Sequence, residues 1–577
     1  MRCTRAGRPL GLLFATLIGC QSASPTRPAD KTFPTPSELE ELPAPLPAQR
    51  LLETDVDDVD EWTLSGPFPE RVEDSLHAPA NPWEALLGDA VGRRPGLAVS
   101  TEAMHCTARE VGLFLLQRGK LPPRTLLEFT AARCGVVGED FRPAWFQGMV
   151  PSNVSDEEVL EQWRPQIEEL VQHSMGGGAV AAGLWFGRSE GRAVVSIAST
   201  VRHVLVTPFS PVAAGGRVSF QGEALASVQE VSGYANQGRL GYAECIADTA
   251  VRLPKFSLSC PVSASDPFAI VEVSTRAPGR ILSDGALRVL ARRPGDDGRR
   301  WRRVQHAPSR PATSERDFAR GVFESLALVR SDAELHALVL SEAQSEQASA
   351  LLPHMVAGSI GLSSPALADM AALGLAAGWR VGGAVKDAAI ATDSVAGSID
   401  AGRWLDAALE RPLGRAALLD PDARVLAVAA LTSAQPPAVV AVAATYALFG
   451  EEDFRADAAL LLQRIATARA AQGKSPAVAL AAVQPLIDET ARDLPAHHRD
   501  PQIALQEALG RATAAAGRSL HGWVLEGRDA GVLPLPGELT DWDELSLAVA
   551  VGYYQPADEP WGRTVAFLIA TPPDVGI

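Results

Sequence analysis

A pattern that occurs three times along the chain limits the possible folds more than any other feature. In each case a stretch with helical periodicity ends in two apolar strands that follow one another closely. The strand pairs are predicted at residues 179–186 with 193–199, 425–430 with 439–448, and 547–554 with 564–571. Consecutive short strands of this kind pair as antiparallel hairpins, and helices grouped apart from such hairpins are typical of the α+β class. The sequence therefore predicts an α+β protein with a repeated unit.

The first hairpin contains a serine pattern that needs a separate explanation. Residues 187–191 fit the Gly-x-Ser-x-Gly expression of serine hydrolases, with Ser189 at the centre. That chemistry requires a strand, a sharp elbow and then a helix, so that the serine stands over an oxyanion hole. Here a second apolar strand follows, and we predict a hairpin turn. Helices are predicted before it, at residues 103–118, 124–133 and 155–173.

A module of different texture occupies residues 201–293. Short alternating runs separated by Pro and Gly predict a small antiparallel β-sandwich. Its strands are expected at Val201–Val206, Arg217–Gln221, Val251–Leu253, Phe268–Val273 and Leu287–Leu290. The Arg-rich, Pro-containing residues 294–314 that follow are expected to be a linker.

Four of the six cysteines fall into two close pairs, Cys106 with Cys134 and Cys245 with Cys260. An even number of cysteines in an exported chain indicates local disulfides. The first would join two helices of the first unit, and the second would join neighbouring strands of the β-sandwich. A metal site is the alternative, but the chain has no Cys-x-x-Cys spacing and only His105 adjoins a cysteine.

The first twenty residues have the features of an export signal. Three arginines and no acid precede an apolar stretch that ends at Gly19, which is too short to span a bilayer and suits a signal-peptide core. The sequence Leu17-Ile18-Gly19-Cys20 resembles the lipobox of bacterial lipoproteins. This resemblance implies removal of residues 1–19, attachment of palmitate or a similar acyl chain to Cys20, and membrane anchoring. Gln21 replaces the Asp of an inner-membrane retention signal, which favours the outer membrane. An ordinary secretory peptide is the alternative.

Composition predicts the character of the segment that follows. Residues 20–83 are rich in Pro, Ser, Thr and Ala and then acidic, with few apolar residues to pack, so a flexible tether is expected. Alternate acids between Asp55 and Asp60 suggest calcium, but the glycine that turns a calcium loop is absent. The formal net charge of −17 argues against a nucleic-acid partner, whose phosphates require a basic surface.

Residues 411–429 carry a resemblance to a known family. Arg411-Pro412-Leu413-Gly414-Arg415 leads through Leu419-Asp420-Pro421 into the strand Val425-Leu426-Ala427-Val428-Ala429. This resembles the late motif of bacterial CAP-superfamily domains (the SCP-like, cysteine-rich secretory protein family), where a Pro-Gly-His-Arg helix precedes a Leu-Asp-Pro turn and a Val-Gly-Val-Gly strand. Shorter likenesses occur at residues 181–184, 460–465, 485–491 and 549–553. The resemblance implies three α-β-α sandwich domains, at residues 84–200, 315–450 and 451–577.

The polar cluster that this resemblance implies is incomplete. Family members often carry two His and two acids around a cleft, able to hold a divalent metal. Here Gly414 runs directly into Arg415 with no His between them, and Glu110 and Val111 follow Ala108-Arg109 where the first His should lie. We therefore expect no catalytic residues, no metal and no cofactor.

These features together predict a non-catalytic lipoprotein of the cell envelope, with CAP-like domains around a β-sandwich. Its partner could be an envelope protein, a lipid or a glycan, and the sequence does not choose among them. The alternative is an envelope hydrolase that uses His497 or His498 with Glu489 or Asp500. A third possibility is an accessory protein of secretion or motility.

Overall fold

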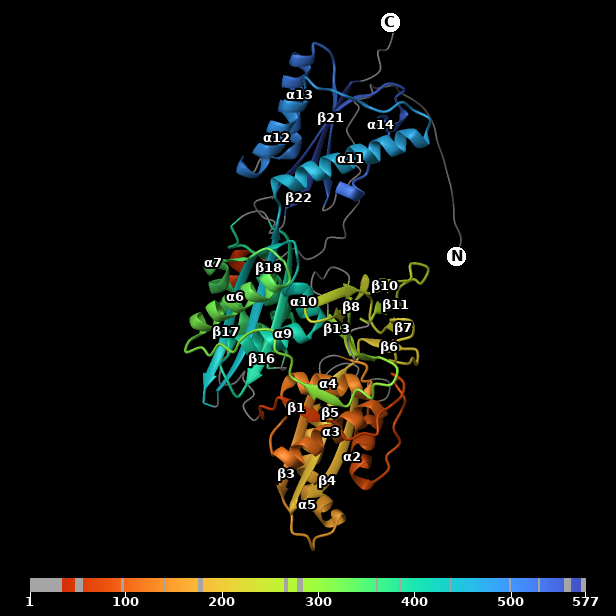
Figure 1. Ribbon diagram of the computed structural model, residues 1–577, viewed down its shortest axis with the longest axis vertical. Coiled ribbons are helices and arrows are strands. Elements are labelled where there is room, and N and C mark those ends of the chain that lie inside the picture. The colour runs from red at the N-terminus through yellow and green to blue at the C-terminus, as the bar shows by residue number, and fades with distance from the viewer. Residues whose placement is uncertain are drawn as a thin grey trace, which may run out of the picture.

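The structure is a computed structural model that describes residues 34–46, 56–94, 98–138, 141–174, 180–263, 268–277, 284–359, 362–382, 385–435, 437–497, 500–527, 530–554 and 562–571. Within these ranges the chain forms five four-stranded sheets and one two-stranded sheet together with many helices, so the predicted α+β class is confirmed. Figure 1 shows the first α+β unit at one end of the long axis and the last at the other, with the second unit and a β-sandwich between them.

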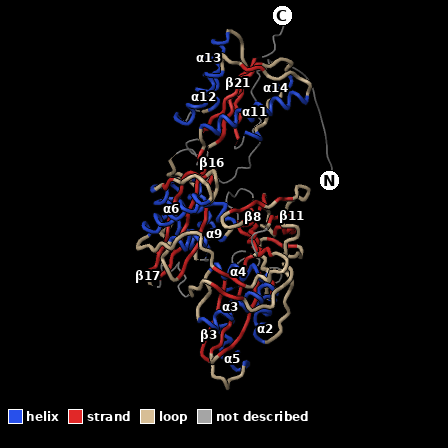
Figure 2. Tube along the Cα trace, viewed as in Figure 1, coloured by secondary structure: helices blue, strands red, loops and turns tan. Residues whose placement is uncertain are grey.

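The first unit runs from α2 to β5, and its sheet has helices on both faces. Figure 2 shows its strands packed among these helices. Its elements are α2 (Pro82–Gly92), β2 (Ala98–Ser100), α3 (Glu102–Arg118), α4 (Arg124–Cys134), β3 (Arg142–Met149), α5 (Asp156–Ser174), β4 (Val180–Ser189) and β5 (Arg192–Val201). The turn between β4 and β5 has Glu190 and Gly191 at positive φ, with Ser189 paired to Arg192. The predicted hairpin at the serine pattern is therefore confirmed.

The second and third units repeat the same order of elements. The second unit contains α6 (Glu315–Asp332), β15 (Val339–Leu340), α7 (Glu342–Ser359), α8 (Pro365–Ala377), β16 (Val385–Ala396), α9 (Ala401–Glu410), α10 (Pro412–Leu418), β17 (Ala423–Ala434) and β18 (Pro437–Leu448). The third contains α11 (Glu451–Ala471), β19 (Val478–Ala479), α12 (Gln484–His497), α13 (Pro501–Ala516), β20 (His521–Gly527), η2 (Ala530–Val532), α14 (Glu538–Asp541), β21 (Ser546–Tyr554) and β22 (Arg563–Thr571).

All three sheets have one topology. Their strand orders are β2-β4-β5-β3, β15-β17-β18-β16 and β19-β21-β22-β20. In each, a short first strand pairs parallel with the third strand, and every other pairing is antiparallel. The order of helices and strands along the chain is also shared, so the repetition seen in the hairpins extends to the whole unit.

A buried arginine strengthens the equivalence of the second and third units. Arg330 near the end of α6 and Arg469 near the end of α11 are both 0% exposed. Each donates Nε to the carbonyl six residues later, at 2.8 Å in both units. Each also donates Nη1 to carbonyls just before the third strand, those of Leu418 and Asp420 in one unit and of Leu539 and Trp542 in the other.

The module between the first two units consists of two stacked antiparallel sheets of order β10-β11-β7-β6 and β13-β12-β8-β9. Its strands are β6 (Val204–Val206), β7 (Arg217–Ala224), β8 (Glu230–Gln237), β9 (Gly241–Glu244), β10 (Ile246–Ala247), β11 (Lys255–Pro261), β12 (Phe268–Arg276) and β13 (Asp284–Arg292). Alternate residues of these strands form one core. The strand predicted at Val251–Leu253 is wrong, since these residues belong to the turn before β11, and β8 was not predicted.

Both predicted cysteine pairs lie at disulfide distance. The Sγ atoms are 2.01 Å apart for Cys106 and Cys134, which join α3 to α4, and 2.08 Å apart for Cys245 and Cys260 in the β-sandwich.

The tether predicted at residues 20–83 is wrong for its second half. From Val56 onward the chain packs on the body: β1 (Glu61–Thr63) pairs with β14 (Arg300–Arg302), and Val59, Leu64 and Val72 are buried. Asp58 forms ion pairs with Arg303 and Arg403 and is not merely solvated. The acidic composition concealed the apolar residues between these acids. Before this stretch, α1 (Pro36–Glu40) packs on α8, where Leu39 lies against Gly374.

The linker predicted at residues 294–314 is also wrong as a flexible segment. Trp301 is 3% exposed within a cluster that includes Leu64 and Phe114, and the amides of His306 and Ala307 donate to Asp406. Paired strands and buried side chains therefore fix this segment between the β-sandwich and the second unit.

Charged groups, all but one of them largely buried, fasten the first unit, the β-sandwich and the second unit together; the exception is Arg124, whose side chain is 45% exposed. We call Arg124, Glu128, Glu272, Arg288 and Arg411 the junction cluster. Arg124 and Arg288 lie 2.9 Å and 3.0 Å from the carboxylate of Glu128 on α4, and Arg288 also donates Nε to Glu272 at 2.9 Å. Arg411, which precedes α10, donates to Glu272 at 3.1 Å. Burial opposes ionisation, but the arginines hold the pKa of Glu272 below its ordinary value and lower that of Glu128 to about 2.

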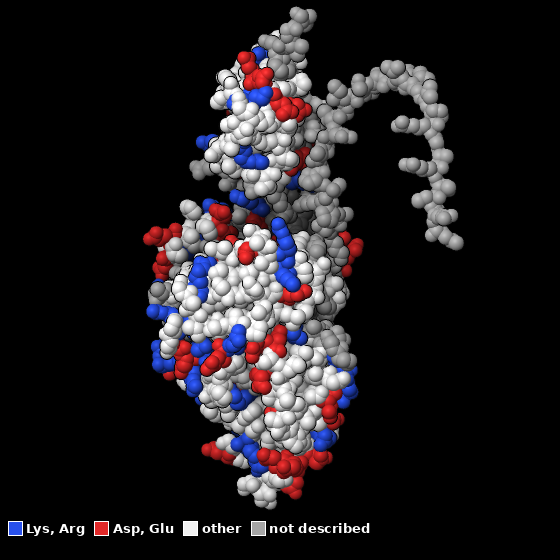
Figure 3. Space-filling model, turned by 90° about the vertical axis from the view of Figure 1, so that its right-hand side faces the viewer, with Lys and Arg blue, Asp and Glu red and all other residues white. Residues whose placement is uncertain are grey.

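Among the described residues, no helix combines the length and the apolar character needed to cross a membrane. On the face drawn in Figure 3, acidic and basic side chains are interspersed over the end units as well as the middle of the protein.

Candidate functional site

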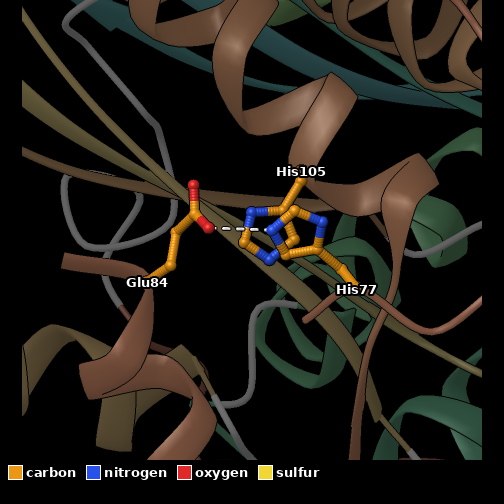
Figure 4. A group of neighbouring side chains, drawn as sticks. All are labelled: His77, Glu84 and His105. Carbon is orange, nitrogen blue, oxygen red and sulfur yellow. Dashed lines mark hydrogen bonds and ion pairs between the residues drawn. The ribbon is translucent and has the colours of Figure 1, made fainter. Parts of the chain in front are cut away.

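The first unit brings two histidines and a glutamate into contact. His77 lies in the segment before α2, Glu84 in the first turn of α2, and His105 in the first turn of α3. One ligand atom of each residue lies within 4.8 Å of the others. Figure 4 shows the carboxylate of Glu84 directed at the two overlapping imidazole rings. We call these three residues the His-Glu cluster.

Backbone pairing brings His77 to α3. Leu76 forms an antiparallel bridge with Thr101, the amide of His77 donates to the carbonyl of Ser100, and the amide of Glu102 donates to the carbonyl of Ser75. Residues 72–77 thus act as an added strand beside the end of β2. At the start of this segment, Val72 forms a bridge with Phe209 of the β-sandwich. The segment therefore contacts two domains.

The N-terminus of α2 orients Glu84. Asn81 caps the helix by accepting a hydrogen bond from the amide of Glu84 at 3.0 Å, and its side-chain amide donates to Oε1 of Glu84 at 2.9 Å. Oε2 accepts from the amide of Ala80 at 2.7 Å. Two hydrogen bonds from one short loop therefore hold the two oxygens of the carboxylate before any ligand arrives.

A glycine lets His105 approach the sheet. Thr101 caps α3 through the amide of Met104, which places His105 on the first turn. At Gly183 of β4, an added Cβ would lie 2.2 Å from the backbone carbon of Met104 and 2.3 Å from the backbone nitrogen of His105. Only glycine permits this close packing of helix on strand, and the approach leaves His105 8% exposed.

The distances within the site are those of direct contact. Nε2 of His77 lies 2.8 Å from Oε2 of Glu84, and Nδ1 of His77 lies 2.9 Å from Oε1 of Glu102. The rings of His77 and His105 stack, with centroids 3.7 Å apart and planes inclined by 28°. Nε2 of His105 is 2.9 Å from Oγ of Ser100. The site therefore has two imidazoles, one oriented carboxylate and a second carboxylate beside it.

The pKa values of the two histidines are shifted in opposite directions. Burial, reinforced by the neighbouring His77, lowers the pKa of His105 to about 4, so this imidazole is neutral at neutral pH. Partial burial acts against His77, but the contacts with Glu84 and Glu102 outweigh it and raise its pKa. Burial also opposes ionisation of Glu84, yet the amide of Ala80 and His77 keep the pKa of this carboxyl below its usual range. A neutral imidazole, an ionised carboxylate and a second imidazole suit metal binding or proton transfer.

The residues predicted for the alternative hydrolase do not form a comparable site in the described part of the chain. The carboxylate of Glu489 pairs with Arg511 at 3.0 Å, and Asp500 caps α13 through the amides of Gln502 and Ile503. His497 is the last residue of α12, its side chain lies outside the described residues, and so does His498. Cys20, the predicted lipidation site, also lies outside them.

The His-Glu cluster was not predicted from the sequence. His77 falls within the predicted tether, and His105 was noted only as a neighbour of Cys106. Two signals were present: Asn81 followed three residues later by Glu84, and Thr101 followed by Glu102, both typical helix starts. They located the two helix ends but not the bridge between Leu76 and Thr101 that joins them.

No protein-family profile and no curated protein matches this chain. Among solved structures, an extracellular protein containing an SCP domain from Bacillus anthracis is similar at 14% sequence identity, over 40% of this chain and 82% of its own, with a TM-score of 0.18. A superposition of this quality supports no conclusion about the site.

Proposed function

We propose that the protein is a lipid-anchored lipoprotein of the cell envelope, held in the outer membrane, whose CAP-like units form a non-catalytic scaffold that binds an envelope or extracellular partner. The main support for this proposal is the position of residues 411–418, which are packed against the β-sandwich. In the family that the sequence resembles, this motif borders the cleft. In this chain, the same motif forms a contact between domains.

Arg415 makes the central contact. It is 4% exposed, and its Nη1 donates to the carbonyls of Gly238 and Gly241 in the β-sandwich at 3.1 Å and 2.8 Å. Beside it, the amide of Leu413 donates to Glu272 at 2.9 Å. A motif whose polar groups are buried against a neighbouring domain has no free donors for a substrate. The arrangement favours a structural role for the second unit.

The lipid anchor can be tested with two cysteines of the N-terminal segment. Cells that express the wild type, Cys20→Ser or Cys3→Ser are labelled with a radioactive fatty acid, and their membranes are separated by density. The wild type and Cys3→Ser should be labelled and should float with the outer membrane. Cys20→Ser should lose the label and leave the membrane fraction, because acyl chains supply the anchoring. Label retained in Cys20→Ser would refute the anchor.

The scaffold and the hydrolase make opposite predictions for a complementation experiment. A deletion strain with an envelope defect is complemented with the chain that carries His497→Ala, His498→Ala and Glu489→Gln together. A scaffold should restore the wild-type envelope fully, whereas a hydrolase that uses these groups should fail at normal protein levels. If the variant is well expressed but does not restore the envelope, the scaffold proposal is wrong and the hydrolase should replace it.

A further inference from the structure

We propose that the His-Glu cluster binds one divalent transition-metal ion of the zinc class, with one imidazole nitrogen from His77, one from His105 and a carboxylate oxygen of Glu84 as ligands. This site is distinct from the one that the family resemblance implies, since no residue of the motif at 411–418 contributes to it. The inference goes beyond the scaffold function and does not depend on it.

The donor set selects the kind of ion. Two imidazole nitrogens and one carboxylate oxygen suit Zn²⁺ and its borderline neighbours, while Ca²⁺ and Mg²⁺ prefer oxygen ligands alone. Three protein ligands with a fourth position left for water or a hydroxyl is a common zinc arrangement. Ser100 Oγ, 2.9 Å from Nε2 of His105, and solvent are the candidates for that position.

The ligand atoms lie close together before any ion binds, within 4.8 Å of one another. Ligand atoms around tetrahedral zinc are about 3.3 Å apart, given bond lengths of about 2.0 to 2.1 Å. Nε2 of His77 and Oε2 of Glu84 are 2.8 Å apart because they share a proton in a hydrogen bond. A cation replaces that proton: His77 loses it to solvent, and the lone pair it occupied binds the metal. Opening the contact between His77 and Glu84 makes room for the ion. One imidazole ring must also turn, because the two rings stack with planes inclined by 28° and a ring nitrogen binds a metal in its own plane.

The surroundings have the features of a built site. Glu102 contacts Nδ1 of His77 at 2.9 Å, which is the carboxylate–histidine–metal arrangement that fixes the ring and increases its basicity. This contact is an ion pair and not an aligned hydrogen bond, since Nδ1 has no hydrogen-bond partner. Glu84 is held by Ala80 and Asn81, so neither carboxylate oxygen is free to turn away. The side chains of His77 and Glu84 remain 15% and 12% exposed, enough for an ion to enter from solvent.

Binding would tie together three segments that are distant in the sequence. The segment 72–77 contacts both the first unit and the β-sandwich, so the ion would also strengthen the contact between these domains. We therefore expect the metal to raise the thermal stability of the first unit in proportion to RT ln(1 + [L]/Kd).

The test uses the full-length protein in mild detergent, with affinity tags removed and bound metal stripped by a chelator. Equilibrium dialysis against Zn²⁺, followed by elemental analysis, should give one zinc per chain. His77→Gln, His105→Gln and Glu84→Gln should each weaken zinc affinity by more than about 100-fold, and Glu102→Gln by about 10-fold, the usual size of an outer-shell effect. His336→Gln, which changes an exposed histidine of the second unit, is the matched control and should bind as the wild type does.

Co²⁺ provides a readout independent of affinity. In the wild type it should give the visible absorption of a four-coordinate site, and in His105→Gln that spectrum should disappear. Far-UV circular dichroism and thermal melts without metal show whether each variant folds. If His105→Gln does not fold, Glu102→Gln decides the question, because it leaves all three ligands in place.

Three outcomes would overturn the proposal: no zinc at one equivalent per chain, unchanged affinity in the folded His77→Gln and Glu102→Gln variants, or loss of binding in a variant that lacks only His497 and His498. The last result would locate the ion in the third unit. None of these outcomes affects the test of the lipid anchor at Cys20.

Discussion

Replacing Glu272 should disturb the junction of the three domains more than any other single conservative change. Its side chain is 0% exposed, and it accepts hydrogen bonds from Arg288 of the β-sandwich, and from Arg411 and the amide of Leu413 in the second unit. Glu272→Gln keeps the shape and one acceptor oxygen but removes the charge. Arg288 and Arg411, whose side chains are 7% and 17% exposed, would then lose the buried carboxylate that both of them contact.

The magnitude follows from burial. Removing one partner of a buried ion pair costs about 3–5 kcal/mol, because the other charge remains desolvated and unpaired. Domains are stable by only about 5–15 kcal/mol, so a loss of this size is a large fraction of the stability of the β-sandwich. Glu230→Gln is the matched control on the same module: the side chains of Glu230 and Arg276 are 45% and 29% exposed, and an exposed pair is worth at most about 1 kcal/mol.

Hydrogen exchange is the suitable assay, since a protein of several domains does not unfold in one step. Amides of β12 and β13 should exchange through openings that cost about 3–5 kcal/mol less in Glu272→Gln than in the wild type. The same amides in Glu230→Gln should change little. Equal protection in the two variants would show that the junction cluster does not hold these domains together.

Three further predictions test other parts of the structure. Burial, aided by Glu128 and Asp393, raises the pKa of Glu410 to about 8, so the folded state retains a proton that the unfolded state releases. The free energy of unfolding should therefore fall by at least about 1 kcal/mol as pH rises from about 5 to about 8, and Glu410→Gln should remove this dependence in denaturant titrations. Gly183→Ala should destabilise the first unit by about 1–3 kcal/mol through overpacking on Met104, whereas Gly510→Ala, with open space around its Cβ in α13, should stabilise the third unit by about 0.5–1 kcal/mol. A Gly183→Ala variant that melts at or above the wild-type temperature would refute the close packing. Arg469→Met should lower the melting temperature of the third unit while that of the other units is unchanged, because it leaves four carbonyls without their donor.

Local patterns predicted the elements that local forces determine. The hairpins of the three units consist of continuous apolar runs, and α3, α4 and α5 begin and end within one or two residues of the predicted ranges. Among the strands that were missed, β3, β16 and β20 are the long ones of the three units, and they lie at the edges of their sheets. An edge strand is half exposed and carries Pro, Gly or charged residues, so its sequence does not show the periodicity of a buried strand. Pairing with the hairpin, which is a tertiary contact, determines its structure.

The candidate site was beyond prediction for a related reason. Its ligand residues are spread over positions 77 to 105, and each has a plausible local role as a helix-start or loop residue. Their proximity depends on the bridge of Leu76 with Thr101 and on the close packing that Gly183 permits. Neither contact has a periodic signature in one sequence. The acidic composition of residues 53–83 also led to the wrong prediction of a solvated tether. Some of these acids pair with arginines at residues 300–303, and the sequence alone does not show these partners.

The strand register helps to explain why the His-Glu cluster, among the described residues, lies in the first unit. Ala98, Val339 and Val478 occupy the same place in the three sheets, paired parallel with Val180, Val425 and Ser546. The residue six positions after each of these lies on the following helix: Met104, Ser345 and Gln484. Each faces the strand residue three positions after the paired one: Gly183, Val428 and Val549.

At this shared position the contact between helix and strand is made by a different residue in each unit. Ser345 accepts a hydrogen bond from the amide of Val428, and Gln484 exchanges two with the backbone of Val549. At this position only the first unit has glycine, and an added Cβ at Gly183 would lie 2.2 Å from the backbone of Met104. The next residue along is His105 in this unit and Glu346 or Pro485 in the others. A close approach and an imidazole thus coincide in one copy, which is how a repeated scaffold can carry a single site.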